Sequence, residues 1–276
     1  MSNAVSQIQI PAPLQRKLRA PFFPTTLSQT MPDSIYGPPW QVIYAEDFEG
    51  KWSNSYLSPP TGGLGTTPSG WGFIDNDTGC YRMITEERAV RGSRSLFLRS
   101  PTIAGGKADI HKYVNLPGGT KFVRLEHWFL LSNNSRNQGG NFKHVSLEVW
   151  GDNNIKYESI LSYYPNGTNW AVGANFGGAG VSARMKCDGE DNNSEPWHYV
   201  AQIIDLTNLI STSVIVDDQV LTGLANTALR QLSDGSYANI PKPLRIEFGP
   251  INGGVHNSPT DDWWMAVDDI VVSVLT

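Results

Sequence analysis

The chain has 276 residues, of which 17% are charged and 39% are hydrophobic, and it contains 27 glycines and 18 prolines. This composition is typical of a folded, turn-rich protein and excludes an intrinsically disordered chain. The formal net charge of -5, with lysines and arginines scattered along the chain, offers no basic surface for nucleic acid. No run approaches the ~18 consecutive apolar residues that a membrane span requires.

Residues 1–39 differ in composition from the rest of the chain. Prolines from Pro11 to Pro39 interrupt any helix or strand, and the first residues lack the basic and apolar stretches of a secretory signal. A segment of this kind cannot build a core of its own, so it is either a disordered leader or an arm that lies along its own domain or a neighbouring subunit. We predict an extended assembly arm whose contact residues are Leu14, Arg16, Lys17, Arg19, Phe22 and Phe23.

Residues 40–276 show short β-type runs separated by clusters of Gly, Asn, Asp and Pro, with no sustained helical periodicity. This pattern predicts one all-β domain with two packed antiparallel sheets. A hairpin is expected over 214–221 and one short helix over 222–232. The two cysteines, Cys80 and Cys187, form one disulfide or remain two thiols, and the sequence leaves this open.

Two segments at opposite ends of this domain are expected to pair. The first, residues 40–50, ends in Asp47-Phe48-Glu49-Gly50, and the second, residues 261–274, contains Val267-Asp268-Asp269-Ile270. The second segment is β-branched and aromatic, which suits a buried strand, yet two adjacent carboxylates lie in its middle. Since successive side chains of a strand point to opposite faces, one of these carboxylates faces the core. It must therefore be paired, hydrogen-bonded or bound to a metal.

These segments resemble the first and last strands of the concanavalin A-like lectin and glucanase group, laminin-G-like domains and several carbohydrate-binding modules. The resemblance implies a two-sheet antiparallel jelly-roll sandwich over 40–276, preceded by the proline-rich arm. In several such modules a Glu of the first strand and an Asp of the last share a structural calcium ion, which binds oxygen ligands. If this chain follows the same pattern, the calcium ligands would be Glu49 and Asp269, with Asp47 and Asp268 beside them. The alternative is that these acids cap strand ends and contact arginine or water.

Aromatic side chains in or beside the predicted loops are candidates for stacking on sugars. Carbohydrate-binding modules use flat aromatic faces together with amides and carboxylates, while most tryptophans of a β-sandwich instead fill its core. The candidates for glycan binding are Trp52, Trp71, Tyr163, Tyr164 and Trp170.

The best enzymatic alternative is a jelly-roll polysaccharide lyase. His111 and Tyr113 alternate on one predicted strand and therefore share a face, and His144 lies on another. The Tyr-x-Lys-Ala-Gly-x-Tyr signature of a lyase family is absent, as is the Glu-x-Asp-x-x-Glu run expected of a jelly-roll glycosidase.

We expect the protein to bind and not to catalyse. A fold that normally faces the outside of a cell, without an export signal, suggests a virion surface component assembled in host cytoplasm: a capsid decoration, head-fibre or tail-associated protein. Residues 1–39 would anchor it to other virion subunits or to its own copies. The alternative is a secreted carbohydrate-binding module or polysaccharide lyase that binds a surface glycan.

Overall fold

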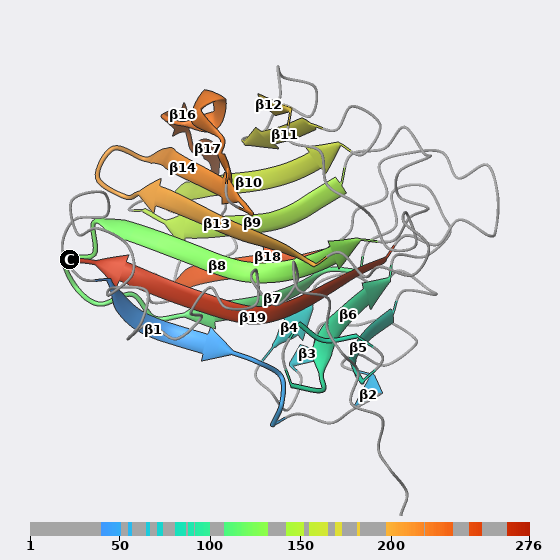
Figure 1. Ribbon diagram of the computed structural model, residues 1–276. Helices are drawn as coiled ribbons and strands as arrows, with labels where there is room; N and C mark the ends of the chain where they lie inside the picture. The colour runs from blue at the N-terminus through green and yellow to red at the C-terminus, as the bar shows by residue number, and fades with distance from the viewer. Residues whose placement is uncertain are drawn as a thin grey trace, which may run out of the picture. The chain divides into compact units, whose positions relative to one another are not determined.

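The computed structural model describes residues 40–50, 55–56, 65–66, 71–73, 81–86, 88–90, 92–99, 108–131, 142–151, 155–164, 169–172, 181–182, 197–217, 219–233, 243–249 and 264–276. The described residues form two antiparallel sheets (Figure 1). The prediction of an all-β jelly-roll sandwich is confirmed. The predicted assembly arm, residues 1–39, lies outside the described residues, as do Cys80 and Cys187.

We call the first layer sheet A. Its strands follow the spatial order β15 (Gln219–Val220), β14 (Ile210–Val216), β13 (His198–Asp205), β8 (Phe122–Leu131), β19 (Trp264–Leu275), β6 (Ser95–Arg99), β5 (Tyr81–Thr85) and β2 (Ser55–Tyr56). Two further strands join it, β1 (Gln41–Glu46) beside β19 and β16 (Thr227–Ala228) beside β14.

The second layer is sheet B. Its order is β12 (Val181–Ser182), β11 (Asn169–Val172), β10 (Ile155–Tyr164), β9 (Phe142–Trp150), β18 (Leu244–Phe248), β7 (Ile110–Val114), β4 (Gly72–Phe73) and β3 (Gly65–Thr66). Strand β17 (Arg230–Ser233) pairs with β10. Pairs of consecutive strands alternate with pairs that are distant in sequence, such as β8 with β19 and β9 with β18, as in a jelly roll.

The two terminal strands of the sandwich pair as predicted. Strand β1 runs antiparallel to β19, with Gln41 opposite Val274 and Glu46 opposite Ile270. The β19 strand, drawn in red in Figure 1, also pairs with β8 and β6, so it lies in the middle of sheet A. Its burial on both faces explains why its sequence is almost continuously apolar.

Aromatic and aliphatic side chains from both sheets interdigitate in the core. Phe129 of sheet A packs edge-on against Trp170 of sheet B, with ring centroids 5.9 Å apart. The rings of His127 in sheet A and Phe248 in sheet B also pack edge-on, with their centroids 4.9 Å apart. Along the strands of sheet B, inward-facing core residues alternate with residues that face the other way. The opposite face of sheet B can therefore carry polar side chains.

The helix predicted over 222–232 is wrong. Residues Thr222–Leu224 form a single 3-10 turn, and the chain then enters β16 and β17. The helix was predicted from the spacing of Leu224, Ala228, Leu229 and Leu232, and two of these residues, Leu224 and Leu229, are instead buried in the sandwich core. The predicted hairpin over 214–221 is confirmed, since Val216 of β14 pairs with Gln219 of β15.

Candidate functional site

The outer face of sheet B, which points away from the core, carries a set of polar side chains on neighbouring strands. In β18, Leu244, Ile246 and Phe248 belong to the core, so Arg245 and Glu247 between them point outward. Residues directly opposite in a ladder share a face. The register therefore places on the outer face of sheet B the polar residues and aromatics His111, Tyr113, Arg245, Glu247, Ser146, Glu148, Trp150, Lys156, Glu158 and Arg230, together with the apolar residues Ile160 and Leu232.

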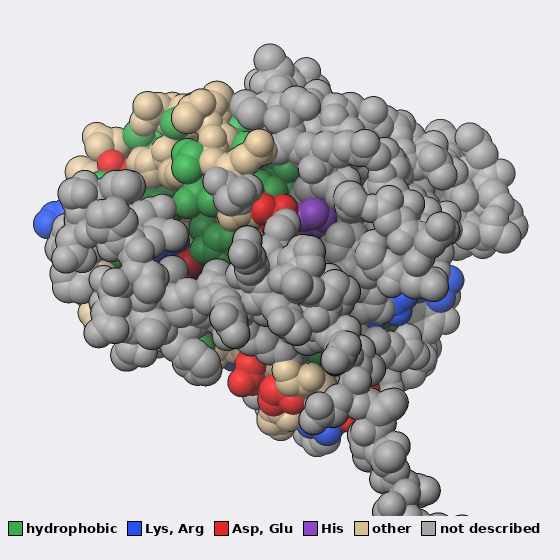
Figure 2. Space-filling model, viewed as in Figure 1, with side chains coloured by type: hydrophobic (Ala, Val, Ile, Leu, Met, Phe, Trp, Pro, Cys, Tyr) green, Lys and Arg blue, Asp and Glu red, His purple; other side chains and the backbone are tan. Residues whose placement is uncertain are grey.

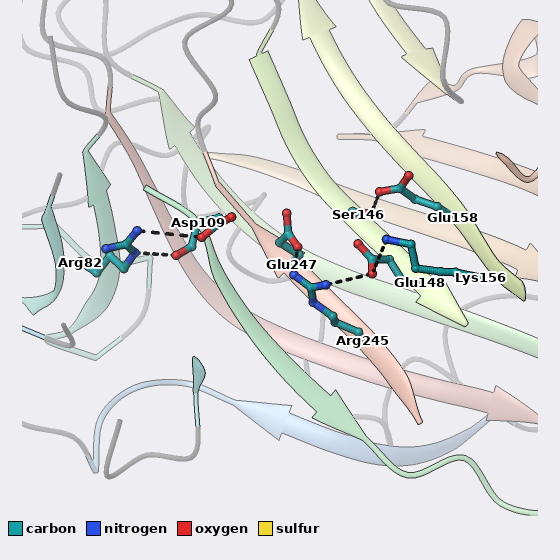
Figure 3. Close-up of polar contacts among 8 residues, drawn as sticks. All are labelled: Arg82, Asp109, Ser146, Glu148, Lys156, Glu158, Arg245 and Glu247. Atoms are coloured by element: carbon teal, nitrogen blue, oxygen red, sulfur yellow. Dashed lines mark hydrogen bonds and ion pairs between the residues drawn. The ribbon is translucent and has the colours of Figure 1, made fainter. Parts of the chain in front are cut away.

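Arg245 is the central cation of this face. Its Nη1 lies 3.1 Å from Oε2 of Glu148, and its Nη2 pairs with Glu247 on the same strand. The Glu148 oxygen also accepts a hydrogen bond from Nζ of Lys156 at 3.2 Å (Figure 3). The Arg245, Glu148 and Glu247 side chains are at least nine-tenths buried. Burial at this depth is tolerated because each charge has a partner of the opposite sign.

A second set of contacts extends the network across β10. Glu158 lies opposite Glu148 in the β9–β10 ladder, and it accepts a hydrogen bond from the Ser146 hydroxyl at 3.0 Å. Its other oxygen lies 3.6 Å from Nη1 of Arg230 on β17. Burial raises the pKa of Glu148; Arg245 and Lys156 act to lower it, while the Glu247 and Glu158 carboxylates act to raise it.

His111 and Tyr113 lie at the edge of the same network, on β7. Their rings are 5.3 Å apart in an edge-to-face arrangement, and they lie opposite Glu247 and Arg245 respectively. The pKa of His111 is lowered from 6.5 to about 4. Burial is the main cause. The positive charge of Arg245 also lowers this pKa, and its effect is larger than the rise caused by the Glu247 carboxylate. The imidazole is therefore neutral near pH 7, the form that can accept a proton.

Two neighbours complete the surroundings of His111 and Tyr113. Gly72 on β4 lies opposite His111, and a Cβ atom at Gly72 would fall 2.6 Å from Nε2 of that ring. Only a residue without a side chain admits the imidazole there. Tyr113 also contacts the indole of Trp150, with centroids 6.1 Å apart, and Tyr113 has an exposed fraction of 36%. Tyr113 is thus the side chain of this pair most open to a ligand.

The predicted sugar-binding aromatics do not form a surface. Trp71, Tyr163 and Trp170 are at most 1% exposed and belong to the hydrophobic core. Their rings pack against other aromatic residues, such as Trp71 against Phe48 and Phe248. These three predictions are corrected, because a ring enclosed in a sandwich core cannot stack on a sugar. Trp52 and the side chains of Tyr164 and His144 lie outside the described residues.

The predicted calcium ligands make hydrogen bonds to backbone groups. Glu49 accepts from the N–H groups of Ser93 and Arg94 at 2.7 and 2.8 Å. Although burial acts to raise it, these bonds hold the pKa of Glu49 below its usual value. Asp47 accepts from the N–H of Glu49, and Asp268 from that of Asp269.

These contacts bear on whether a cation fits. Backbone N–H groups bond to carboxylate oxygens of Asp47, Glu49 and Asp268, and the described residues contain no group of three or more His, Cys, Asp or Glu side chains arranged to hold a metal. A structural calcium ion at these residues stays a prediction.

Sheet A also carries charged pairs, such as Arg124 with Glu126 at 2.8 Å and His198 with Asp217 at 2.9 Å. Among the side chains coloured in Figure 2, hydrophobic and uncharged polar groups gather over β13 and β14, and charged groups are few. The structure contains no helix, within its described ranges, that is long and apolar enough to cross a membrane.

The sequence placed His111 and Tyr113 on one face of a strand, as the register shows, but the prediction missed the residues around them. Arg245 and Glu247 alternate with core residues in Leu244–Phe248, and this period of two was a signal that they face outward. Glu148 and Glu158 show a similar alternation on β9 and β10. What the sequence lacks is the order β10-β9-β18-β7, which places these four strands together.

Comparison with known proteins identifies the fold. No protein-family model and no curated protein matches the chain. An alginate lyase, Aly36B, solved with an alginate trisaccharide, aligns at TM-score 0.50 and 11% identity, covering 84% of this chain and 98% of that one. The endo-β-1,4-glucuronan lyase of the fungus Trichoderma reesei aligns at TM-score 0.46 and 12% identity, covering 77% and 94%. The CBM22-1 xylan-binding domain of Paenibacillus barcinonensis Xyn10C aligns at 0.37 and 10%, covering 86% and 96%.

These likenesses correct the predicted function. The predicted virion surface role is contradicted, because the structure that aligns at TM-score 0.50 shares the fold and is an alginate lyase, not a virion protein. The prediction went wrong where it inferred a virion from an outward-facing fold and the apparent lack of an export signal, neither of which concerns a specific site.

Proposed function

We propose that this protein binds a uronate-containing polysaccharide on the outer face of sheet B and cleaves it by β-elimination. The observation that carries the proposal is the pairing of His111 with Tyr113, whose rings lie 5.3 Å apart beside Arg245. A neutral imidazole and a phenol side by side can take and give a proton in one reaction. A secreted location would suit such a substrate.

The proposed reaction needs one base and one acid. A base removes the proton from carbon 5 of the uronate, and that electron pair forms the C4–C5 double bond. The C4–O4 bond then breaks, and oxygen 4 takes up a proton. We assign the base to His111, whose imidazole lies edge-to-face against Tyr113 and is neutral near pH 7. Tyr113, the more exposed of the two, would protonate the leaving oxygen.

Arg245 supports this pair through its charge. It lies opposite Tyr113 in the β7–β18 ladder and lowers the pKa of His111. Negative charge that develops on the uronate during proton removal would be stabilised by a fixed cation in a poorly solvated site. Glu148 and Glu247 hold the guanidinium in place, so Arg245 would act as a positioned charge.

A second candidate is glycan binding without cleavage. Tyr113 and Trp150 form a contiguous aromatic pair on the outer face of sheet B, with carboxylates on the neighbouring strands. Aromatic stacking combined with hydrogen bonds to hydroxyl groups is the chemistry of a carbohydrate-binding module.

The test is incubation with soluble uronate polymers while the ultraviolet absorbance of the unsaturated uronate product is followed. We expect product formation by the native chain, and a loss of about 100-fold or more in His111→Ala and Tyr113→Phe. Tyr44→Phe is the matched control, since Tyr44 lies on β1 outside this face. Binding without product would favour the second candidate, and neither binding nor product would overturn both.

A further inference from the structure

An arginine of sheet A lies at an inward position, close to the start of the strand that carries His111 and Tyr113. Arg82 of β5 lies opposite Leu98 of β6, and both Leu98 and Ile84 belong to the hydrophobic core. Since side chains alternate along a strand, Arg82 shares the inward face of β5 with Ile84. Its side chain is fully buried. A charged side chain at a core position requires a specific reason, because burial of a charge is costly.

Arg82 reaches from sheet A to the residue that precedes β7 of sheet B. Its Nε donates a hydrogen bond to the backbone carbonyl of Asp109 at 2.5 Å, while its Nη2 lies 3.9 Å from the carboxylate oxygen Oδ1 (Figure 3). The shorter contact is thus the one to the backbone. Burial lowers the pKa of Arg82 to about 10, and the Asp109 carboxylate acts to raise it, so the guanidinium is charged near pH 7. A charged donor holds a carbonyl oxygen more strongly than a neutral donor does.

The backbone at Asp109 is also enclosed from sheet B. Gly249 follows directly after β18, and a Cβ atom at Gly249 would lie 2.7 Å from Cα of Asp109. On the other side of β7, the ladder with β4 consists of one residue pair in the described part of the chain, Gly72 with His111. The start of β7 therefore depends on the contacts that Gly249 and Arg82 make with Asp109.

The position of β7 matters for His111 because its imidazole has little room. A Cβ atom at Gly72 would fall 2.6 Å from Nε2 of the imidazole, and the ring of Tyr113 lies 5.3 Å away. A shift of about 1 Å at the start of the strand would change both contacts, and a misplacement of that size can lower a rate by about 100-fold.

We propose that Arg82 is a positioning residue for the His111–Tyr113 pair, which it holds in place through the backbone of Asp109, two residues before His111. This inference rests on the proposed function. It adds a residue of the opposite sheet that acts on the reaction without touching the substrate.

The test compares Arg82→Met with the native chain on a soluble uronate polymer. Methionine is long, flexible and apolar, so it suits a buried position. We expect kcat to fall by about 10-fold to 100-fold while KM changes by less than about threefold. Arg82→Lys keeps a charged donor and should lose less of kcat than Arg82→Met.

The pKa of His111 gives a second readout that needs no substrate. The charges that act on this pKa are those of Arg245 and Glu247. Loss of the Arg82 charge alone should therefore leave it unchanged, whereas movement of the ring to a more solvated position should raise it from about 4 towards 6.5. An NMR titration of the histidines in Arg82→Met measures this shift.

Arg94→Met is the matched control. Nη1 of Arg94 also donates to a backbone carbonyl, that of Glu49, at 2.7 Å. The control removes the same kind of hydrogen bond away from β7, and it should leave kcat and the His111 pKa unchanged. Gly249→Ala displaces Asp109 from the β18 side and should reproduce both effects of Arg82→Met. It takes the place of Arg82→Met if that variant does not fold, as judged by its thermal melting.

The outcomes separate the two proposals. If the native chain cleaves no uronate polymer, the proposed function is overturned, and the His111 pKa still tests whether Arg82 positions the ring. If the native chain is active and the folded Arg82→Met or Gly249→Ala variant keeps the native kcat and the native His111 pKa, the function stands and the inference is wrong. An equal fall of kcat in Arg82→Met and Arg94→Met would reveal a general structural effect and would also overturn the inference.

Discussion

The carboxylate of Asp268 accepts a hydrogen bond from the backbone N–H of Val90 at 2.9 Å, across 178 residues of sequence. Asp268 is fully buried, and its second oxygen accepts from the N–H of Asp269 at 2.8 Å. The ladder between β19 and β8 shifts register at this point, and Asp269 has a φ of 49°. A β-bulge thus turns the backbone so that one acidic side chain satisfies two amides.

Asp268→Ala should therefore destabilise the sandwich. Two buried N–H groups would lose their acceptor, which costs about 3 kcal/mol of unfolding free energy. Urea denaturation at pH 7 measures this. Asp268→Asn keeps one acceptor oxygen and should lose less stability, and equal stability of the Ala variant and the native chain would contradict the role given to this carboxylate.

Gly72→Ala should displace the imidazole of His111 without unfolding the protein. The new methyl group would fall 2.6 Å from Nε2, so the ring must move away from β4. Greater solvation would raise the pKa of His111 from about 4 towards its ordinary value of 6.5. An NMR titration of the histidines detects this shift. Gly118→Ala is the matched control, since nothing lies within 4 Å of a Cβ atom there, and a His111 pKa unchanged by Gly72→Ala would refute the packing argument.

Buried histidines should make the protein sensitive to acid. Burial lowers the pKa of His127, which lies in the core, to about 3. Its folded pKa lies below that of the unfolded chain, so between about pH 6.5 and 3 the unfolded state binds a proton that the folded state does not. The contribution of neutral His127 to the unfolding free energy is therefore fully present above pH 6.5. It decreases by a few kcal/mol as the pH falls from 6.5 to 3.

His127→Leu tests that prediction. The variant cannot bind the proton, so its unfolding free energy should fall less steeply than that of the native chain between pH 6.5 and 4. Denaturant titrations at several pH values give both curves. Parallel curves would show that His127 does not carry the acid sensitivity, whatever the stability of the variant at pH 7.

Glu49→Ala should loosen the turn that contains Ser93 and Arg94. The Glu49 carboxylate accepts hydrogen bonds from both backbone N–H groups and from the Ser93 hydroxyl at 3.0 Å. The carboxylate can lie this close to the turn because residue 92 is a glycine, which has no Cβ atom and adopts a φ of 64°. Because this site is partly exposed, we expect a loss of about 1 kcal/mol, measured by thermal denaturation. The same loss should occur with a chelator present.

Calcium can be tested with the same pair of proteins. A rise in Tm when calcium is added to the native chain, absent in Glu49→Ala, would establish the ion at Asp47, Glu49, Asp268 and Asp269. No rise would count against a calcium ion at these acids.

Local patterns were sufficient for the architecture. Alternating β-branched and aromatic residues bounded by Gly, Pro and Asn predict most strands, and the apolar run of β19 indicates a strand buried on both faces. The pairing of β1 with β19 agrees with the resemblance of these two segments to the first and last strands of jelly-roll sandwiches. The helix over 222–232 failed because tertiary burial of Leu224 and Leu229 outweighs a short helical period.

The sequence by itself determined that the chain forms an all-β sandwich and that His111 and Tyr113 share one face of a strand, because side-chain direction follows from a period of two. Only the tertiary structure decided which aromatics enter the core and which acids meet Arg245. Glu148 and Arg245 are 97 residues apart, and they meet because β18 pairs with β9. Strand order depends on long-range pairing, which no local pattern encodes.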